Sequence, residues 1–119
     1  MRIPDRPRII RRMLAWRLQR VAARRPVLAA SFVRFQHRCG KATCVCHQGG
    51  PLHRSQHLTF KERGQKTRSV YVPKELIKDV QSWIQEHKRL KQLLQEIHQL
   101  TLALVRTHVT QRRRQKGRP

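Results

Sequence analysis

The chain has 119 residues, and its 28 lysines and arginines outnumber its 6 aspartates and glutamates to give a formal net charge of +22. This length favours one small domain with extensions, and an aromatic content of 5% implies a thin core. Solubility alone needs a net charge of only about 2–8, so the excess of cations predicts a polyanionic partner. Nucleic acid is the expected partner, because its phosphates bind lysine and arginine largely without regard to sequence.

The sequence contains no apolar segment long enough to span a membrane. Its longest nearly uncharged apolar run, "PVLAASFV" at 26–33, is far shorter than the roughly 20 residues of a spanning helix. An arginine-rich start resembles an organelle transit peptide, but the arginines continue past any targeting length. We therefore expect no membrane partner.

Residues 1–25 are predicted to form a basic helical arm. Ile10, Leu14, Leu18 and Val21 fall on one apolar stripe at helical spacing, and Pro26 is expected to end the helix. Arginines fill the remaining positions and are candidates for phosphate contacts: Arg8, Arg11, Arg12, Arg17, Arg20, Arg24 and Arg25.

Residues 26–73 are predicted to hold a cysteine loop and a β-hairpin. "LAASFVRFQ" at 28–36 reads as a short strand that leads into the loop. "HLTFKERGQKTRSVYVP" at 57–73 reads as a hairpin whose turn contains Gly64, which can adopt positive φ. The cations around this turn are further candidates for nucleic-acid binding: Lys61, Arg63, Lys66 and Arg68.

"HRCGKATCVCHQGGPLH" at 37–53 contains all three cysteines and three of the seven histidines. The spacing Cys39-x4-Cys44-x-Cys46-x6-His53 supplies three thiols and an imidazole, which suit a closed tetrahedral site for structural Zn²⁺. In an extended chain Cys44 and Cys46 share one side. The two glycines that follow allow a turn that brings His53 back.

The fourth ligand has alternatives in His37, His47 and His57. Free or redox-active thiols are the competing interpretation of the cluster, and three thiols so close together suit a reducing compartment. Arg38 and Lys41 would lower the pKa of the thiols in either case and are also candidates for phosphate contacts.

Residues 74–110 are predicted to form a long amphipathic helix with a coiled-coil pattern. Such a helix would either pair with a second copy or a larger protein partner, or fold back on the N-terminal helix. The first apolar seam repeats every seven residues as Leu76, Trp83, Leu90, Ile97 and Leu104; the second is Val80, His87, Leu94, Thr101 and His108.

The tail at 111–119 has no acid and no apolar residue, and we expect it to be disordered until bound. Its candidates for phosphate contacts are Arg112, Arg113, Arg114 and Lys116.

Catalysis is not expected. The six acids are scattered along the chain, whereas nuclease and strand-transfer chemistry need clustered carboxylates for metal ions. The sequence has no glycine-rich phosphate loop and no nucleophile elbow.

The stretches "RCGKATCVCHQGGPLH" and "TRSVYVPKEL", followed by the long helix, resemble a family of small uncharacterised prokaryotic proteins often encoded near transposases. The resemblance covers about residues 32–108 and implies a mobile-element setting without any established activity. The matching positions are Arg38, Cys39, Gly40, Lys41, Cys44, Cys46, Gly49, His53, Tyr71, Val72 and Pro73.

These patterns together predict a small α+β fold and a cytoplasmic, nucleoid-associated accessory protein of a mobile element. It would bind DNA through its cationic segments. An RNA- or ribosome-binding protein is one alternative, and a helical interaction subunit that docks on a transposase or another effector is the other.

Overall fold

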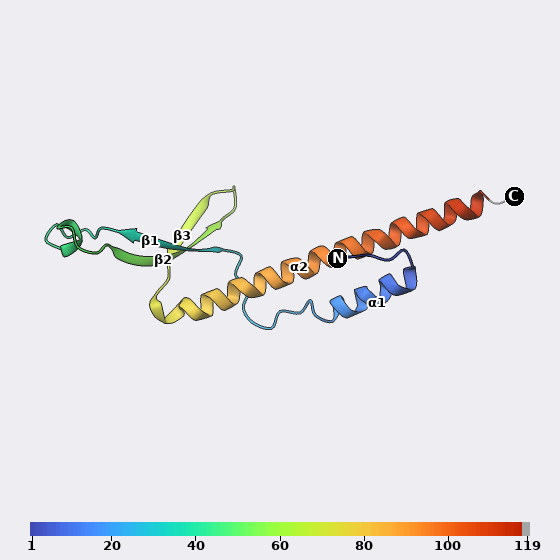
Figure 1. Ribbon diagram of the computed structural model, residues 1–119, viewed down its shortest axis with the longest axis horizontal. Coiled ribbons are helices and arrows are strands. Elements are labelled where there is room, and N and C mark those ends of the chain that lie inside the picture. Colours follow the sequence, from blue (N-terminus) through green and yellow to red (C-terminus); the bar gives the residue numbers. More distant parts are fainter. Residues whose placement is uncertain (118–119) are drawn as a thin grey trace. The chain divides into compact units, whose positions relative to one another are not determined.

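The computed structural model describes residues 1–117 and has the predicted α+β class, with two α-helices and a three-stranded sheet among these residues (Figure 1). The chain divides into two compact units. One unit contains Met1–Arg25 together with the chain from Lys88 onward, and the other contains Pro26–His87. The long helix α2, Ile77–Lys116, contributes to both units.

Helix α1 spans Pro7–Leu18 and has proline in its first turn, where a missing N–H costs nothing. It ends seven residues earlier than expected. The guanidinium of Arg89 donates hydrogen bonds to the carbonyls of Arg20 (2.8 Å) and Ala22 (3.0 Å), so these carbonyls are bonded outside any helix. Leu18, placed on the apolar stripe by its spacing, is exposed.

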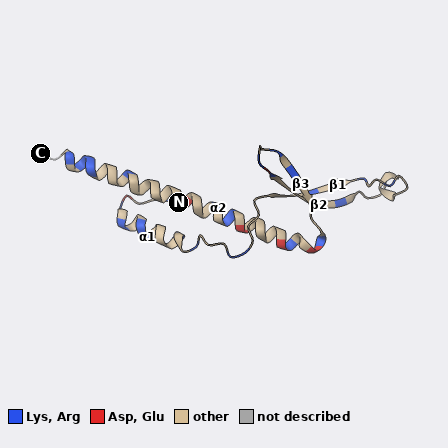
Figure 2. Ribbon diagram, turned by 180° about the vertical axis from the view of Figure 1, so that it is seen from behind, with Lys and Arg blue, Asp and Glu red and all other residues tan. Residues whose placement is uncertain are grey.

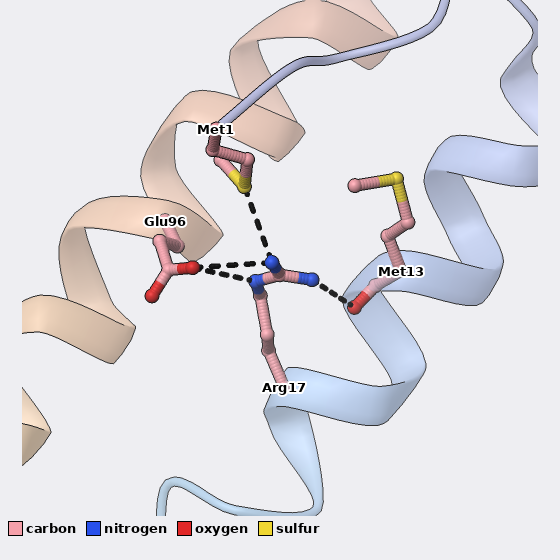
Figure 3. Close-up of polar contacts among 4 residues, drawn as sticks. All are labelled: Met1, Met13, Arg17 and Glu96. Atoms are coloured by element: carbon pink, nitrogen blue, oxygen red, sulfur yellow. Dashed lines mark hydrogen bonds and ion pairs between the residues drawn. The ribbon is translucent and has the colours of Figure 1, made fainter.

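The core of the first unit forms where α1 packs on α2. Ile10 and Leu14 of α1 are buried with Leu100 of α2. Beside this core, Arg17 donates two hydrogen bonds to one carboxylate oxygen of Glu96, at 3.2 and 3.1 Å (Figure 3). The fold-back predicted as one alternative for the long helix is therefore present within the chain.

The buried face of α2 follows the predicted heptads in part: Val80 is buried, and Ile97 and Leu104 pack against the core formed with α1. Leu93 and Leu100 are buried, whereas Leu94 of the predicted second seam is 57% exposed. In a straight helix with 3.6 residues per turn, a stripe of residues spaced seven apart rotates around the helix axis by about 20° per heptad. A supercoil with a second long helix would cancel this rotation, but α1, the only other α-helix among the described residues, is short. The contact with α1 therefore uses Leu100 together with Ile97 and Leu104 of the predicted first seam.

Helix α2 also runs past residue 110 to Lys116, so the structure differs from the expected disorder at residues 111–116. Arginine, glutamine and lysine are good helix formers, and cations near a helix C-terminus interact favourably with its dipole. The rest of the predicted disordered tail, residues 118–119, lies outside the described residues.

The sheet of the second unit has the order β1-β2-β3, with both pairs antiparallel. Its strands are β1, Ser31–His37; β2, His53–Lys61; and β3, Thr67–Tyr71. The predicted β2–β3 hairpin is confirmed, and Gly64 has the expected positive φ of 82° in its turn. The sequence analysis did not predict that β1 pairs with β2.

One face of the sheet packs against the start of α2. Leu58 and Val72 are buried together with Val80 and Ile84 of the helix. A 3₁₀ turn at Lys74–Leu76 leads into α2, with Pro73 just before it. No helix among residues 1–117 is both long enough and apolar enough to cross a membrane.

Candidate metal centre

The β1–β2 hairpin places the cysteine segment at its tip, seen as the green loop beyond the two strands in Figure 1. The last pair of the ladder joins His37 to His53. Cys39 lies two residues past this pair on one side, and His53 belongs to the pair on the other. Strand pairing therefore brings together two ligands that are fourteen positions apart in sequence.

The middle of the loop is a 3₁₀ turn, Val45–His47, with Cys44 at its N-cap. The N–H groups of His47 and Gln48 donate to the carbonyls of Cys44 (3.0 Å) and Val45 (2.9 Å). The extended chain assumed for Cys44 and Cys46 is thus wrong, although the two thiols still meet. Cys46 is buried, and its thiol is 3.4 Å from the N–H of Cys39.

Two glycines close the loop for different reasons. Gly49 adopts a φ of 83°, which side chains disfavour. Gly50 has an ordinary φ, but a Cβ there would collide with the side chain and the carbonyl of Val45. Glycine thus favours the return to β2 at both positions, through backbone conformation at Gly49 and through space at Gly50.

The four predicted ligands converge. Their donor atoms, from Cys39, Cys44, Cys46 and His53, all lie within 4.8 Å of one another and could hold a metal ion. The sulfurs of Cys39 and Cys46 are 3.6 Å apart, too far for a disulfide bond of about 2.0 Å. The Cys44 sulfur is 3.3 Å from Nε2 of His53.

The three alternative histidines make other contacts. Nε2 of His47 lies 2.6 Å from the carbonyl of Cys39 and so braces the loop. His37 and His57 both approach the hydroxyl of Ser55, at 3.5 and 3.0 Å. Within the described residues, His53 is thus the histidine that joins the three thiols.

The pKa values of the thiols diverge. A backbone hydrogen bond from Cys46 and a side-chain bond from His53 lower the pKa of Cys44 to about 6. At Cys39 the backbone hydrogen bond with Lys41 acts to lower the pKa, but burial and the neighbouring thiols outweigh it and raise the pKa. Cys44 consequently ionises before Cys39 and is better prepared to bind a cation.

The predicted nucleic-acid contacts fall on several surfaces. Arg8 and Arg12 are exposed on the side of α1 opposite the buried Ile10 and Leu14, and Arg11 is exposed at its flank. Figure 2 shows a further group of cations in the last turns of α2. The remaining predicted contacts exposed in the cysteine loop and at the hairpin turn are Arg38, Lys41, Lys61, Arg63 and Lys66.

Arg17, Arg20 and Arg68 are among the predicted contacts that are already engaged within the chain. Arg17 has a side chain only 12% exposed and is bound to Glu96. Arg20 stacks over the ring of Trp16 at 4.1 Å, and Arg68 pairs with Glu62 at the surface. Because the Arg17 guanidinium is mostly buried and paired with Glu96, it has little surface left to bind a phosphate.

A row of rings on the outer face of the sheet was not predicted from the sequence. Phe35, His57 and Tyr71 come from β1, β2 and β3 and contact one another edge to face. Each strand contributes one ring to the row, but a single ring in a strand does not reveal which strands are neighbours.

The fold and the site define a small α+β protein with a cysteine–histidine cluster at a hairpin tip. Residues 10–82 match a family described as a domain of unknown function (DUF6788), and since this match spans more than half of the chain, the protein belongs to that family. No curated protein and no solved structure matches the chain.

Proposed function

We propose that the protein binds nucleic acid, with DNA favoured, and that a structural Zn²⁺ ion organises its cysteine loop. The charge balance carries the first part of the proposal. Six acids can neutralise at most six of the 28 cations, and the net charge of +22 needs an external polyanion when the chain is compact.

The arrangement of α1 supports phosphate binding. Its apolar side is used in the core, while Arg8 and Arg12 are left exposed on the other side and Arg11 at its flank. Such a row can follow a phosphate backbone without reading bases. The accessory role in a mobile element is supported by the sequence resemblance.

The donor geometry supports zinc. Tetrahedral Zn–S bonds of about 2.3 Å separate two sulfurs by about 3.8 Å, and a sulfur from an imidazole nitrogen by about 3.5 Å. Two of the six separations are 3.6 and 3.3 Å, and all six are within 4.8 Å. Three thiolates and one histidine leave no open coordination position, so the ion would hold the loop together rather than catalyse a reaction.

A salt titration tests the nucleic-acid part. If six to ten phosphates are contacted, affinity for duplex DNA should fall about 10³- to 10⁵-fold between 50 and 200 mM salt. Replacing Arg8, Arg11 and Arg12 with glutamine should weaken binding and flatten the slope. Replacing Lys74, Lys78 and Lys91 with glutamine removes the same charge from another part of the chain and should weaken DNA binding less. Equal losses in both variants, or a flat salt response in the parent protein, would contradict the proposal.

Metal analysis tests the zinc part. Protein purified without chelator should contain one zinc ion per chain, and Cys46→Ser should lose it, whereas His98→Ala on α2 should keep it. A chelator should loosen residues 37–60 in hydrogen exchange. Metal-free protein with an equally protected loop would exclude a structural ion.

A helical interaction subunit is the second candidate function. Leu94 and Val105 are 57% and 56% exposed on α2, and eleven residues make about three turns, so the two side chains share a face. A second copy of the chain is the partner that the heptad pattern favours.

A further inference from the structure

The geometry points to an unpaired-base binding surface on the outer face of the sheet, formed by Phe35, His57 and Tyr71. This inference rests on the proposed nucleic-acid function and adds a ligand class to it: single-stranded nucleic acid. We call these three residues the aromatic row.

The aromatic row lies on the face of the sheet that α2 does not cover. Side chains alternate along a strand, so His57 and Leu58 point to opposite faces, and Leu58 is in the core with α2. Tyr71 pairs with His57 in the β2–β3 register, and Phe35 is diagonal to His57 across the β1–β2 register. The three rings therefore cross the sheet on its outer face.

The rings meet edge to face and keep much of their surface exposed. Ring centroids are 5.2 Å apart for Phe35 and His57 and 5.8 Å apart for His57 and Tyr71, both with an interplanar angle of 69°. Phe35 remains 45% exposed and Tyr71 remains 58% exposed. Two large rings exposed to this extent on a strand face offer stacking surface that the fold itself does not use.

The central ring is held in position by a buried hydroxyl. Ser55, two residues before His57 on the same face, is buried and has its Oγ 3.0 Å from Nε2 of His57. A fixed ring binds a base at a lower entropic cost than a mobile one.

A hollow of about 390 Å³ adjoins the row, with His57, Tyr71, Ser55 and Arg54 among its lining residues. It offers a base two ring walls, those of His57 and Tyr71, because the hydroxyl of Ser55 is already in contact with His57 and His37 and strand alternation turns the side chain of Arg54 to the opposite face. Aromatic rings across a sheet combined with cations are the means by which proteins bind single strands. A duplex cannot use the row, because its bases are already stacked on each other.

The test compares a short oligothymidylate, the matching oligouridylate and a duplex, all at one salt concentration, by fluorescence anisotropy. Phe35→Ala and Tyr71→Ala should weaken single-strand binding roughly 5- to 100-fold each and leave duplex binding unchanged. Tyr71→Phe should bind as the parent does, whereas Tyr71→Leu, which keeps bulk but lacks a ring face, should bind as Tyr71→Ala does. Relative affinity for the two oligomers separates DNA from RNA as the source of the bases.

Val70→Ala is the matched control. Val70 is the neighbour of Tyr71 on β3, is 50% exposed, and points to the opposite face. It should have no effect on single-strand binding.

The outcomes separate the two proposals. If the alanine variants bind oligothymidylate as the parent does, if they lose duplex binding equally, or if Tyr71→Leu matches the parent, the aromatic row only stabilises the sheet and this inference is wrong while phosphate binding stands. A parent protein that binds neither single strands nor duplex at low salt overturns both.

Discussion

Arg17 and Glu96 lie 79 positions apart in sequence, yet two guanidinium nitrogens of Arg17 share one carboxylate oxygen of Glu96 at 3.1–3.2 Å. A third nitrogen donates to the carbonyl of Met13 (Figure 3). The two side chains are only 12% and 20% exposed. In a chain with six acids, one of them is thus used to neutralise an arginine beside the core of the first unit.

Glu96→Gln should therefore destabilise the protein by about 1–3 kcal/mol, because a neutral amide replaces the carboxylate that neutralises a partly buried guanidinium. Chemical denaturation measures the loss. Glu62→Gln is the matched control: its pair with Arg68 is more than half exposed on both sides and should be worth less than about 1 kcal/mol. Equal losses of unfolding free energy in the two variants would show that the Arg17–Glu96 pair stabilises the protein no more than an exposed ion pair does.

Gly50→Ala should weaken metal binding without changing any ligand. A Cβ at this position collides with Val45, so the loop must open and move Cys46 away from its partners. Gly40→Ala is the control, because a Cβ at Gly40 meets nothing within 4 Å. Competition with a zinc indicator reports the two affinities. If Gly50→Ala binds metal as tightly as Gly40→Ala, the tight return of the loop is not required for the site.

Cys44 should react faster than Cys39 in the metal-free protein. With its pKa lowered to about 6, it is mostly thiolate at neutral pH, so its alkylation rate should plateau above that pH. As pH falls through this value the thiolate protonates, and the rate should drop about tenfold per pH unit. Cys39, whose pKa is raised, should gain reactivity only at higher pH. Peptide mapping after timed iodoacetamide treatment distinguishes the sites, and faster labelling of Cys39 at neutral pH would refute the assignment.

Self-association through α2 should rise with salt. Like charges repel two copies of a +22 chain at low ionic strength, and salt screens this repulsion while leaving apolar contacts intact. Light scattering should show a monomer in dilute buffer and a dimer in concentrated salt. Leu94→Glu with Val105→Glu should abolish the dimer, whereas Gln92→Glu with Gln99→Glu, which makes the same change in charge, should leave it intact. If the parent protein stays monomeric at every salt concentration, a second copy of the chain is not the partner of α2.

The fold class, the β2–β3 hairpin and the ligand set were predictable because each depends on local spacing. The turn at Gly64 needs only neighbouring residues to be recognised. The four ligands lie within fifteen residues, so any compact loop brings them close. The chemistry of thiols and imidazole then indicates a metal whatever the detailed path of the backbone.

The parts that escaped prediction depend on distant contacts. The end of α1 is determined by Arg89, which no local pattern around Leu18 reveals. The burial of Leu100 in place of Thr101 of the predicted second seam depends on where α1 lies along α2. The aromatic row needs the register of three strands, which is a property of their pairing and not of any one strand.

The pairing of His37 with His53 makes the cysteine loop depend on the alignment of the two strands that support it. Side chains alternate between faces, so inserting a single residue in β1 or β2 would turn the imidazole of His53 away from the thiols. Any ion that ties His53 to Cys44 would correspondingly penalise every misaligned pairing during folding. A metal-bound loop would then favour the correct register of β1 and β2, at the end of the hairpin where the two strands can shift most easily.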